Sequence, residues 1–217
     1  MMEQINKRRL VWGAGFVAAF VLWTVLVRFI DLRAIGPEGS QVGFGALNRF
    51  VHDLTGVNLI LYTLTDWFGL VPIAVAVGFA VLGLAQWIGR KSLKKVDRSI
   101  LALGVFYVVV IATYLFFEAV VINYRPVLIN GYLEASYPSS TTMLAASVMP
   151  TAAKQISLRI KNTALRRCVI LAIIAFTAFM VVGRLLSGVH WITDIIGGVL
   201  LSAGLVTIYF SICNNLK

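Results

Sequence analysis

Several uninterrupted runs of apolar residues constrain this chain more than any other feature of its sequence. A helix of about 20 apolar residues is what crosses the hydrocarbon core of a lipid bilayer. Of the 217 residues, 59% are hydrophobic and only 13% are charged, a composition unlike that of soluble globular domains. The period-two alternation of a membrane β-barrel is absent. The chain is therefore predicted to be an all-α, polytopic membrane protein.

Six of the apolar runs are predicted to be transmembrane helices that pack into a bundle. They cover residues 10–30, 67–89, 99–122, 139–155, 168–186 and 192–213. The first run follows Lys7, Arg8 and Arg9 as a signal peptide would, but it is too long for a signal h-region and has no convincing cleavage site. We expect it to be retained. Without repeats or a second domain, residues 1–217 are predicted to form a single membrane domain.

A polar segment at residues 31–56 separates the first two runs and contains a turn-type cluster at 36–40. After this cluster, four apolar residues recur at helical spacing, on one face of a helix. They are Leu47, Phe50, Val51 and Leu54. This pattern predicts a short helix that lies in the membrane interface, in the first outer loop.

The formal net charge is +10, from 19 Lys and Arg against 9 Asp and Glu. In a soluble protein this excess would suggest a nucleic-acid partner, but the positive-inside rule explains it better in a membrane protein. Most of the basic residues precede the first span, lie at 90–98, or lie at 154–167. These segments and both termini are therefore predicted to be cytoplasmic. The expected partner is the lipid bilayer, and no nucleic acid.

With six spans, three other polar stretches fall together on the extracytoplasmic side. They are the loop that contains Arg125, the helix start at 139–142, and residues 183–194. Within the last stretch, His190 and Asp194 are four residues apart and share one face of a helix. Asp194 can then hold one ring nitrogen of His190 and leave the other available as a nucleophile or base.

The other polar groups of this face suit an anion. Arg125 and Arg184 carry guanidinium groups that can grip phosphate oxygens in pairs. The helix start offers free backbone N–H groups and the hydroxyls of Ser139, Ser140 and Thr141. Together these groups predict an outward-facing phosphate site with an imidazole beside it. For a protein embedded in lipid, the phosphates within reach are those of lipid headgroups.

The order of these residues resembles the type-2 phosphatidic acid phosphatase superfamily. Its signature is Lys-x6-Arg-Pro, then Pro-Ser-Gly-His, then Ser-Arg-x5-His-x3-Asp, on a six-helix membrane core. The corresponding residues here are Arg125-Pro126, Tyr137-Pro138-Ser139-Ser140, and Gly183-Arg184 with His190 and Asp194. The resemblance covers residues 118–194, and the third motif is the most specific. It implies a phosphohydrolase that forms a phospho-histidine intermediate and uses neither a metal nor another cofactor.

By position, the resemblance assigns His190 as the nucleophile and Asp194 as the carboxylate that orients it. Arg125 and Arg184 would hold the phosphate, together with Ser139 and the first turn of its helix. Two positions depart from the family pattern: Glu118 stands at the place of the first-motif lysine, and Thr141 at that of the second-motif histidine. Help from a general acid such as that histidine is worth roughly 10²–10⁴ in rate.

Two residues are candidates to replace the missing proton donor. Glu118 lies near the end of a span, and His52 is the only other histidine of the chain. Each also has a purely structural interpretation: an ion pair with Arg125 for Glu118, and an exposed interfacial position for His52. A substrate with a good leaving group, such as a diphosphate, would need little protonation.

The sequence therefore predicts an integral membrane phosphatase or phosphotransferase at the extracytoplasmic face of a bacterial cytoplasmic membrane. Candidate substrates are phosphatidic acid, phosphatidylglycerol phosphate, and polyprenyl phosphates or diphosphates, among which the sequence does not choose. The alternative is a catalytically degenerate member that binds a lipid phosphate or a partner protein without turnover. A small transporter is a third hypothesis, although only Glu118 would supply an ionisable residue within a span.

Overall fold

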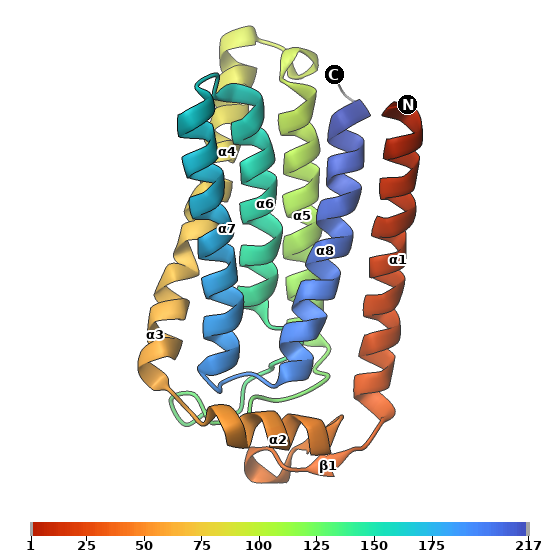
Figure 1. Cartoon of the computed structure of the whole chain (residues 1–217), viewed down its shortest axis with the longest axis vertical. Coiled ribbons are helices and arrows are strands. Elements are labelled where there is room, and N and C mark those ends of the chain that lie inside the picture. Colours follow the sequence, from red (N-terminus) through yellow and green to blue (C-terminus); the bar gives the residue numbers. More distant parts are fainter. Residues whose placement is uncertain (1, 216–217) are drawn as a thin grey trace.

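The computed structural model describes residues 2–215, and helices make up most of them (Figure 1). The elements, in chain order, are α1 (Met2–Phe29), β1 (Arg33–Ala34), η1 (Pro37–Gly39), β2 (Gln41–Val42), α2 (Gly45–Thr55), α3 (Leu59–Phe68), α4 (Leu70–Arg90), η2 (Leu93–Lys95), α5 (Arg98–Ala119), α6 (Ser140–Arg159), α7 (Thr163–Leu186) and α8 (Ile192–Asn215). The long helices run side by side as a bundle, with both termini at one end (Figure 1).

Within the described residues, five helical segments are long and apolar enough to cross a membrane. They are Glu3–Phe29, Leu59–Arg90, Arg98–Ala119, Thr163–Leu186 and Ile192–Asn214. These segments confirm the prediction of a helical, multi-pass membrane protein. The run predicted at 139–155 does form a helix, α6, but α6 is not apolar enough to meet the same criterion. Its crossing of the membrane, and so the count of six, stays a prediction.

The polarity of α6 follows from its place in the bundle. This helix contacts α4, α5, α7 and α8, so protein rather than lipid surrounds much of it. Its buried face carries hydroxyl and amide groups that find partners on neighbouring helices. Ser147 donates to Ser202 of α8 at 3.0 Å, and Gln155 donates to the carbonyl of Ser99 of α5 at 3.0 Å. A central helix of this kind needs no apolar outer surface.

The predicted start of the second span, at residue 67, is wrong. The helical run begins at Leu59, where the side chain of Asn58 caps α3 by accepting from the N–H of Leu61 at 2.9 Å. Trp67 lies inside this run with 69% of its surface exposed, so it does not mark a helix start. The earlier start has a consequence for function, because α3 packs against α7.

Other predicted bounds differ by a few residues. The helix predicted at 99–122 ends at Ala119, whereas α1 and α7 begin several residues before the predicted starts. At these two helix starts, charged residues extend the helix beyond its apolar part, which the search for apolar runs does not detect.

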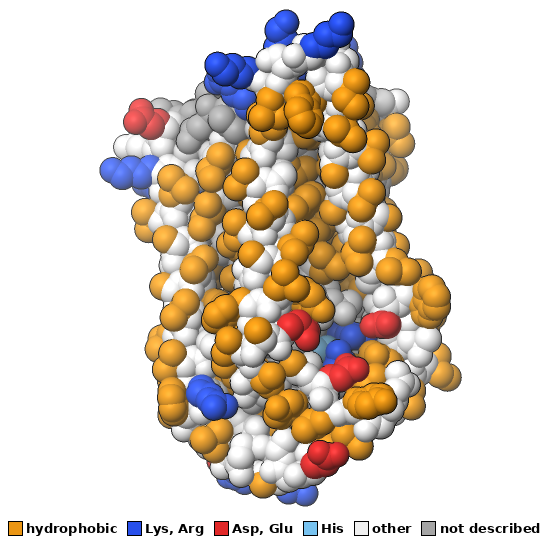
Figure 2. All heavy atoms as spheres, turned by 180° about the vertical axis from the view of Figure 1, so that it is seen from behind, with side chains coloured by type: hydrophobic (Ala, Val, Ile, Leu, Met, Phe, Trp, Pro, Cys, Tyr) orange, Lys and Arg blue, Asp and Glu red, His pale blue; other side chains and the backbone are white. Residues whose placement is uncertain are grey.

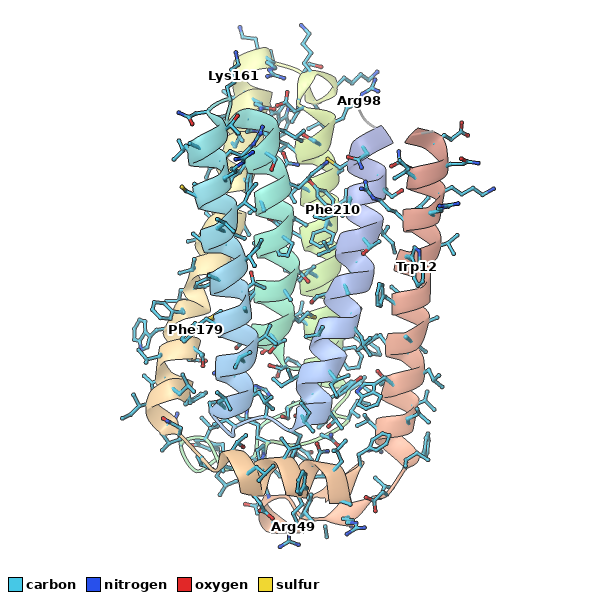
Figure 3. The ribbon with its side chains drawn as sticks, viewed as in Figure 1. Trp12, Arg49, Arg98, Lys161, Phe179 and Phe210 are labelled. Atoms are coloured by element: carbon cyan, nitrogen blue, oxygen red, sulfur yellow. The ribbon has the colours of Figure 1, made fainter. Side chains whose placement is uncertain are left out.

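The surface of the bundle is divided into an apolar middle and charged ends. Hydrophobic side chains cover the middle, and Lys and Arg gather at the end that holds the termini (Figure 2). In Figure 3, Trp12 and Phe179 project outward from the bundle, Arg98 and Lys161 lie at the terminal end, and Arg49 lies at the opposite end. Such a surface suits a bilayer around the middle. Which end faces the cytoplasm stays a prediction.

Helix α2 lies across the end of the bundle that is opposite to the termini (Figure 1). The buried Asn48 attaches it there, donating to the carbonyl of Gly43 at 2.7 Å and to the hydroxyl of Thr193 at 3.0 Å. A helix therefore forms where one was predicted, and Leu47, Phe50 and Leu54 are exposed on it. Its position in the membrane interface stays a prediction.

Helix α1 joins the bundle mainly through α8, and glycines allow the close approach. A Cβ atom on Gly13 would lie 2.6 Å from Cγ1 of Ile208 and 3.1 Å from the carbonyl oxygen of Gly204. On the same helix, a Cβ atom on Gly15 would meet nothing within 4 Å. The two positions therefore form a matched pair.

Substitution of Gly13 by Ala is expected to destabilise the protein by about 1–3 kcal/mol, because the added methyl group pushes α1 away from α8. Gly15→Ala is the control, and it is expected to stabilise the fold by about 0.5–1 kcal/mol through helix propensity. Thermal unfolding in detergent compares the two variants. Equal midpoints for both would contradict this account of the packing between α1 and α8.

Candidate active site

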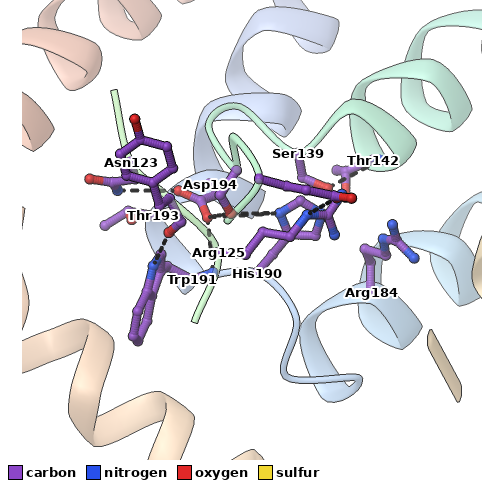
Figure 4. Close-up of polar contacts among 12 residues, drawn as sticks. Asn123, Arg125, Ser139, Thr142, Arg184, His190, Trp191, Thr193 and Asp194 are labelled. Atoms are coloured by element: carbon purple, nitrogen blue, oxygen red, sulfur yellow. Dashed lines mark hydrogen bonds and ion pairs between the residues drawn. The ribbon is translucent and has the colours of Figure 1, made fainter. Parts of the chain in front are cut away.

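A cluster of buried polar side chains lies at the end of the bundle beneath α2, and Figure 4 shows most of it. We call it the polar cluster; its members are Asn123, Arg125, Ser136, His190 and Asp194, each at most 8% exposed. Three come from the connection between α5 and α6, and two from the turn into α8. Buried polar groups must satisfy one another, so their contacts define the site.

The connection between α5 and α6 folds back on itself and brings Arg125 and Ser136 together. The N–H of Arg125 donates to the carbonyl of Glu134 at 3.0 Å, and that of Ser136 donates to the carbonyl of Asn123 at 2.9 Å. This antiparallel pairing resembles a β-hairpin. The chain reverses at Asn130-Gly131, where φ is 50° and 82°, a left-handed conformation that asparagine and glycine tolerate.

The turn between α7 and α8 places His190 inside the protein. Gly188 has φ of 67°, and a Cβ atom there would lie 1.9 Å from the carbonyl oxygen of Gly56, so only glycine fits. On the other side of His190, the indole N–H of Trp191 donates to the carbonyl of Tyr124 at 2.8 Å. The imidazole is thus fixed from both sides along the chain.

His190 and Asp194 come close together as predicted, but the prediction that both lie in one helix is wrong, because α8 begins at Ile192 and His190 lies in the turn before it. A third group also lies between the two side chains. The ring Nδ1 of His190 is 3.8 Å from Oδ2 of Asp194. The hydroxyl of Ser136 is 2.9 Å from Nδ1 and donates to Oδ2 at 2.5 Å. The predicted direct contact is therefore replaced by a bridge through Ser136, a residue that the sequence interpretation missed.

Asp194 accepts further hydrogen bonds and is the centre of the polar cluster. The backbone N–H of Trp191 donates to Oδ2 at 2.9 Å, and Nδ2 of Asn123 donates to Oδ1 at 3.3 Å. The carboxylate is fully buried. These donors stabilise its charge where water cannot.

Arg125 contacts the other nitrogen of the imidazole. Its Nη1 lies 3.4 Å from Nε2 of His190, and its Nε lies 3.0 Å from Oε2 of Glu134. The predicted ion pair between Glu118 and Arg125 is wrong, because in the described part of the chain the ion-pair partner of Arg125 is Glu134. Glu134 is close to Arg125 because the hairpin pairs their backbones.

Arg184 is held on the side of α3, a helix that the sequence interpretation did not assign to the site. Its Nη1 lies 3.3 Å from the hydroxyl of Thr65, its Nη2 lies 3.4 Å from Oδ1 of Asp66, and its guanidinium stacks on the ring of Tyr62 at 4.8 Å. In Figure 4, Arg184 and Asp194 lie on opposite sides of His190. Arg184 is 1% exposed, so α7 carries a buried cation to this place.

The three hydroxyl residues at the start of α6 have different surroundings. Ser139 caps the helix by accepting from the N–H of Thr142 at 3.4 Å, and its own N–H donates to the carbonyl of Asp194 at 3.1 Å. This confirms the predicted helix start. Ser140 lines the pocket of His190, whereas the methyl group of Thr141 lies beside Gly69, between α3 and α4.

A pocket leads from His190 toward the outside between α5 and the start of α6. Its lining residues are Tyr114, Phe117, Glu118, Ala135, Ser136, Tyr137, Pro138, Ser140, Met143 and His190. Tyr114 and Glu118 are exposed residues of α5 at its rim. Figure 2 shows a hollow in the face opposite to that of Figure 1, with a histidine and a basic side chain inside and acidic side chains around it.

His52 lies in different surroundings. It lines a second pocket with Ala34, Ile35, Arg49, Asp53, Pro126 and Trp191. Its ring lies 5.4 Å from that of Trp191, measured between centroids, and its Nε2 is buried without a hydrogen-bond partner. His52 is not among the residues that line the pocket of His190.

The charges around His190 favour a neutral imidazole that faces an anion. Burial, together with the positive charges of Arg125 and Arg184, holds the pKa of His190 well below its usual range. A phosphoryl group beside Nε2 would meet a lone pair on that nitrogen and the guanidinium of Arg125. Within residues 2–215, no three His, Cys, Asp or Glu side chains gather as a metal site requires.

Comparisons with known proteins give two similarities. Residues 105–217 match the model of the PAP2 superfamily. The structure resembles the crystal structure of the first transmembrane PAP2 type phosphatidylglycerolphosphate phosphatase from Bacillus subtilis, with a TM-score of 0.62 and 16% identity, over 94% of this chain and 97% of that chain. At this identity the structural likeness concerns the fold. Comparison with curated protein sequences gives no match.

The ion pair of Arg125 with Glu134 generates a prediction about anion binding. Glu134→Gln removes the competing charge and keeps the shape of the side chain, so inorganic phosphate is expected to bind about three- to tenfold more tightly, up to about 1.4 kcal/mol. Isothermal titration of the purified protein measures the affinity. The matched control is Glu38→Gln, because Glu38 takes part in none of the ion pairs among the described residues. Unchanged or weaker binding in Glu134→Gln alone would refute the competition.

Proposed function

Since the chain belongs to the PAP2 superfamily, we propose that it is an integral membrane phosphatase that acts on a lipid or polyprenyl phosphate or diphosphate through a phospho-histidine intermediate. The observation that carries this proposal is the environment of His190. Its Nε2 lies 3.4 Å from a guanidinium nitrogen of Arg125, while Nδ1 is joined to Asp194 through Ser136. A candidate nucleophile, an anion-binding group and an orienting carboxylate therefore lie together in the polar cluster, and His190 itself lines the pocket.

In this reaction, Nε2 of His190 attacks the phosphorus, and Arg125 stabilises the charge that develops on the phosphoryl oxygens. Arg184 adds a second positive charge from the side of α3. A water molecule then attacks the phospho-histidine and releases inorganic phosphate. The backbone N–H groups at the start of α6 and the hydroxyl of Ser140 are suitable further donors, because Ser140 lines the same pocket.

The shape of the pocket supports a lipid substrate. Phe117 and Met143 provide apolar walls, and the rim at Tyr114 and Glu118 belongs to a helix that meets the criterion for a membrane span. A lipid tail can therefore remain in the bilayer while its phosphate reaches His190. The site lies at the end opposite to the basic one, and by the positive-inside rule we propose that it faces the extracytoplasmic side, with both termini in the cytoplasm.

The leaving group determines how much acid help the reaction needs. Thr141, which stands where the family carries a histidine, lies beside Gly69 and does not line the pocket. The groups at the pocket that can carry a proton to the leaving oxygen are Glu118 and Tyr114. A diphosphate leaves without much protonation, whereas a phosphate monoester would depend on Glu118. The comparison of the two substrate types in Glu118→Gln distinguishes these alternatives.

The alternative function is a binding protein without turnover. Two observations favour it: Thr141 replaces the general acid, and Glu134 already occupies Arg125 at 3.0 Å. Binding of a lipid phosphate without release of inorganic phosphate, over a wide pH range and several substrates, would support this alternative.

The central prediction is that His190→Gln loses at least about 1,000-fold in the rate of phosphate release, because the nucleophile is removed. The purified protein in detergent is assayed with phosphatidic acid, phosphatidylglycerol phosphate, and a polyprenyl phosphate and diphosphate. His52→Gln is the matched control and is expected to retain activity, since His52 lines the other pocket. Substantial activity in His190→Gln would disprove the assignment, and an acid-labile phosphoprotein trapped in the wild type would support it.

The lowered pKa of His190 predicts an unusual pH dependence. The reacting form is the neutral imidazole, and burial beside Arg125 and Arg184 keeps it neutral as the pH falls through about 6.5, the ordinary pKa of histidine. The acidic limb of kcat/KM that His190 controls is therefore expected well below pH 6.5. If the acidic limb of kcat/KM lies at or above pH 6.5 and stays there in Glu118→Gln, burial does not lower the pKa of His190 as expected.

A further inference from the structure

We infer that Ser136 is a positioning residue whose hydroxyl holds His190 in one tautomer, with the proton on Nδ1 and the lone pair on Nε2. The inference rests on the proposed function, because it concerns the nucleophile of that reaction. According to this inference, Asp194 orients His190 through the hydroxyl of Ser136 and not through a direct hydrogen bond.

The distances define this route. Nδ1 of His190 and Oδ2 of Asp194 are 3.8 Å apart, which is too long for a hydrogen bond. The hydroxyl of Ser136 lies between them, 2.9 Å from Nδ1 and 2.5 Å from Oδ2. All three side chains are buried, at 2%, 3% and 0% exposure for Ser136, His190 and Asp194. The hydrogen-bonded route from Asp194 to the ring therefore passes through the hydroxyl of Ser136.

The number of protons on the hydroxyl determines the tautomer. A serine hydroxyl has one hydrogen, and a carboxylate can only accept, so Ser136 donates its hydrogen to Asp194. The oxygen of Ser136 can then only accept from the ring nitrogen at 2.9 Å. His190 must supply that hydrogen from Nδ1, which leaves Nε2 without one.

The contact on the opposite side of the ring independently indicates the same tautomer. Nη1 of Arg125 lies 3.4 Å from Nε2, and a guanidinium has donors but no acceptor. Nε2 must therefore present its lone pair to Arg125. The same lone pair is the one that would attack phosphorus.

The backbone fixes Ser136 in this position. Its N–H donates to the carbonyl of Asn123 at 2.9 Å, and the side chain of Asn123 donates to Asp194 at 3.3 Å. The hairpin thus places the serine and the carboxylate relative to each other before any substrate binds. Such an arrangement costs no reorganisation during the reaction.

The proposed reaction uses the lone pair of Nε2 and leaves the hydrogen on Nδ1 in place. The lone pair of Nε2 forms the N–P bond, the P–O bond to the leaving group breaks, and its electron pair goes to the leaving oxygen. That oxygen takes a proton from Glu118 when the substrate is a monoester and leaves ionised when it is a diphosphate. The ring then carries a positive charge and keeps its hydrogen on Nδ1. The chain from Nδ1–H through the hydroxyl of Ser136 to Asp194 stabilises that charge. When water attacks phosphorus, it gives a proton to the Glu118 carboxylate or to solvent, the N–P electron pair returns to Nε2, and inorganic phosphate leaves.

The first experiment reads the tautomer directly, without an activity assay. The chain contains two histidines, so His52→Gln leaves one imidazole for 15N NMR of labelled protein in detergent. The expected spectrum shows a protonated Nδ1 and an unprotonated Nε2 for His190. Ser136→Ala in the same background is expected to give a mixture of both tautomers, and Ser136→Thr, which keeps the hydroxyl, is expected to restore the first pattern. A protonated Nε2 in the parent protein would overturn the inference without any Ser136 variant.

The second experiment follows the formation of the phosphoenzyme in single turnovers. Ser136→Ala is expected to slow this step by about 10- to 100-fold, the range for removing the hydrogen-bond partner that orients a metal-binding histidine. Ser136→Thr is expected to recover most of the rate, with KM little changed in both variants. Thermal unfolding in detergent accompanies each variant. A loss that Ser136→Thr does not recover, with an unchanged tautomer in Ser136→Ala, would show that the serine is only structural.

The two experiments separate failure of this inference from failure of the proposed function. If the protein shows no phosphatase activity, but Nδ1 is protonated in the parent and Ser136→Ala gives a mixture of tautomers, the role of Ser136 is supported and the proposed function is refuted. If the protein is active, but the tautomer of His190 is the same in Ser136→Ala as in the parent, the proposed function is supported and the role of Ser136 is refuted.

Discussion

The fully buried carboxylate of Asp194 is the constraint on which the functional end of this protein depends. An isolated carboxylate in such a place costs several kcal/mol or more, so every segment that donates to it is held in position. Its side chain accepts from Ser136, Asn123 and the N–H of Trp191, and its backbone carbonyl accepts from the N–H of Ser139. One residue thereby joins the connection between α5 and α6, the start of α6 and the start of α8.

The apolar helices could be predicted from the sequence because lipid imposes their composition. Helices that are shielded from lipid do not follow the same rule. Helix α6 lies among α4, α5, α7 and α8 and carries the buried polar residues Ser147 and Gln155. Its low hydropathy therefore does not reveal its central position in the bundle. Helix α3 was missed because the second span was predicted to begin at residue 67, although Asn58 is a suitable N-cap in the sequence once the earlier start is known.

The site was predictable where its residues are close in the sequence and not where it depends on how the connection between α5 and α6 pairs with itself. The proximity of His190 and Asp194 was predicted from a separation of four residues, although His190 lies in the turn before α8 and only Asp194 lies in the helix. Ser136 and Glu134 reach His190 and Arg125 only because the connection between α5 and α6 folds into a hairpin, and no local pattern determines that register. The partners of Arg184 on α3 were missed for the same reason that α3 itself was missed.

The two arginine side chains of the site are buried, whereas the carboxylates paired with them are exposed to solvent. The guanidiniums of Arg125 and Arg184 are 10% and 1% exposed, whereas their acidic partners, Glu134 and Asp66, are 41% and 58% exposed. Without a phosphate, these carboxylates offset two cations that would be costly to bury unpaired. If the proposed phosphate binds, each exposed carboxylate can turn toward water while the polar cluster and α3 hold the guanidiniums and the imidazole in place. Under the proposed function, phosphate binding would therefore replace one anion with another beside cations that the fold already holds.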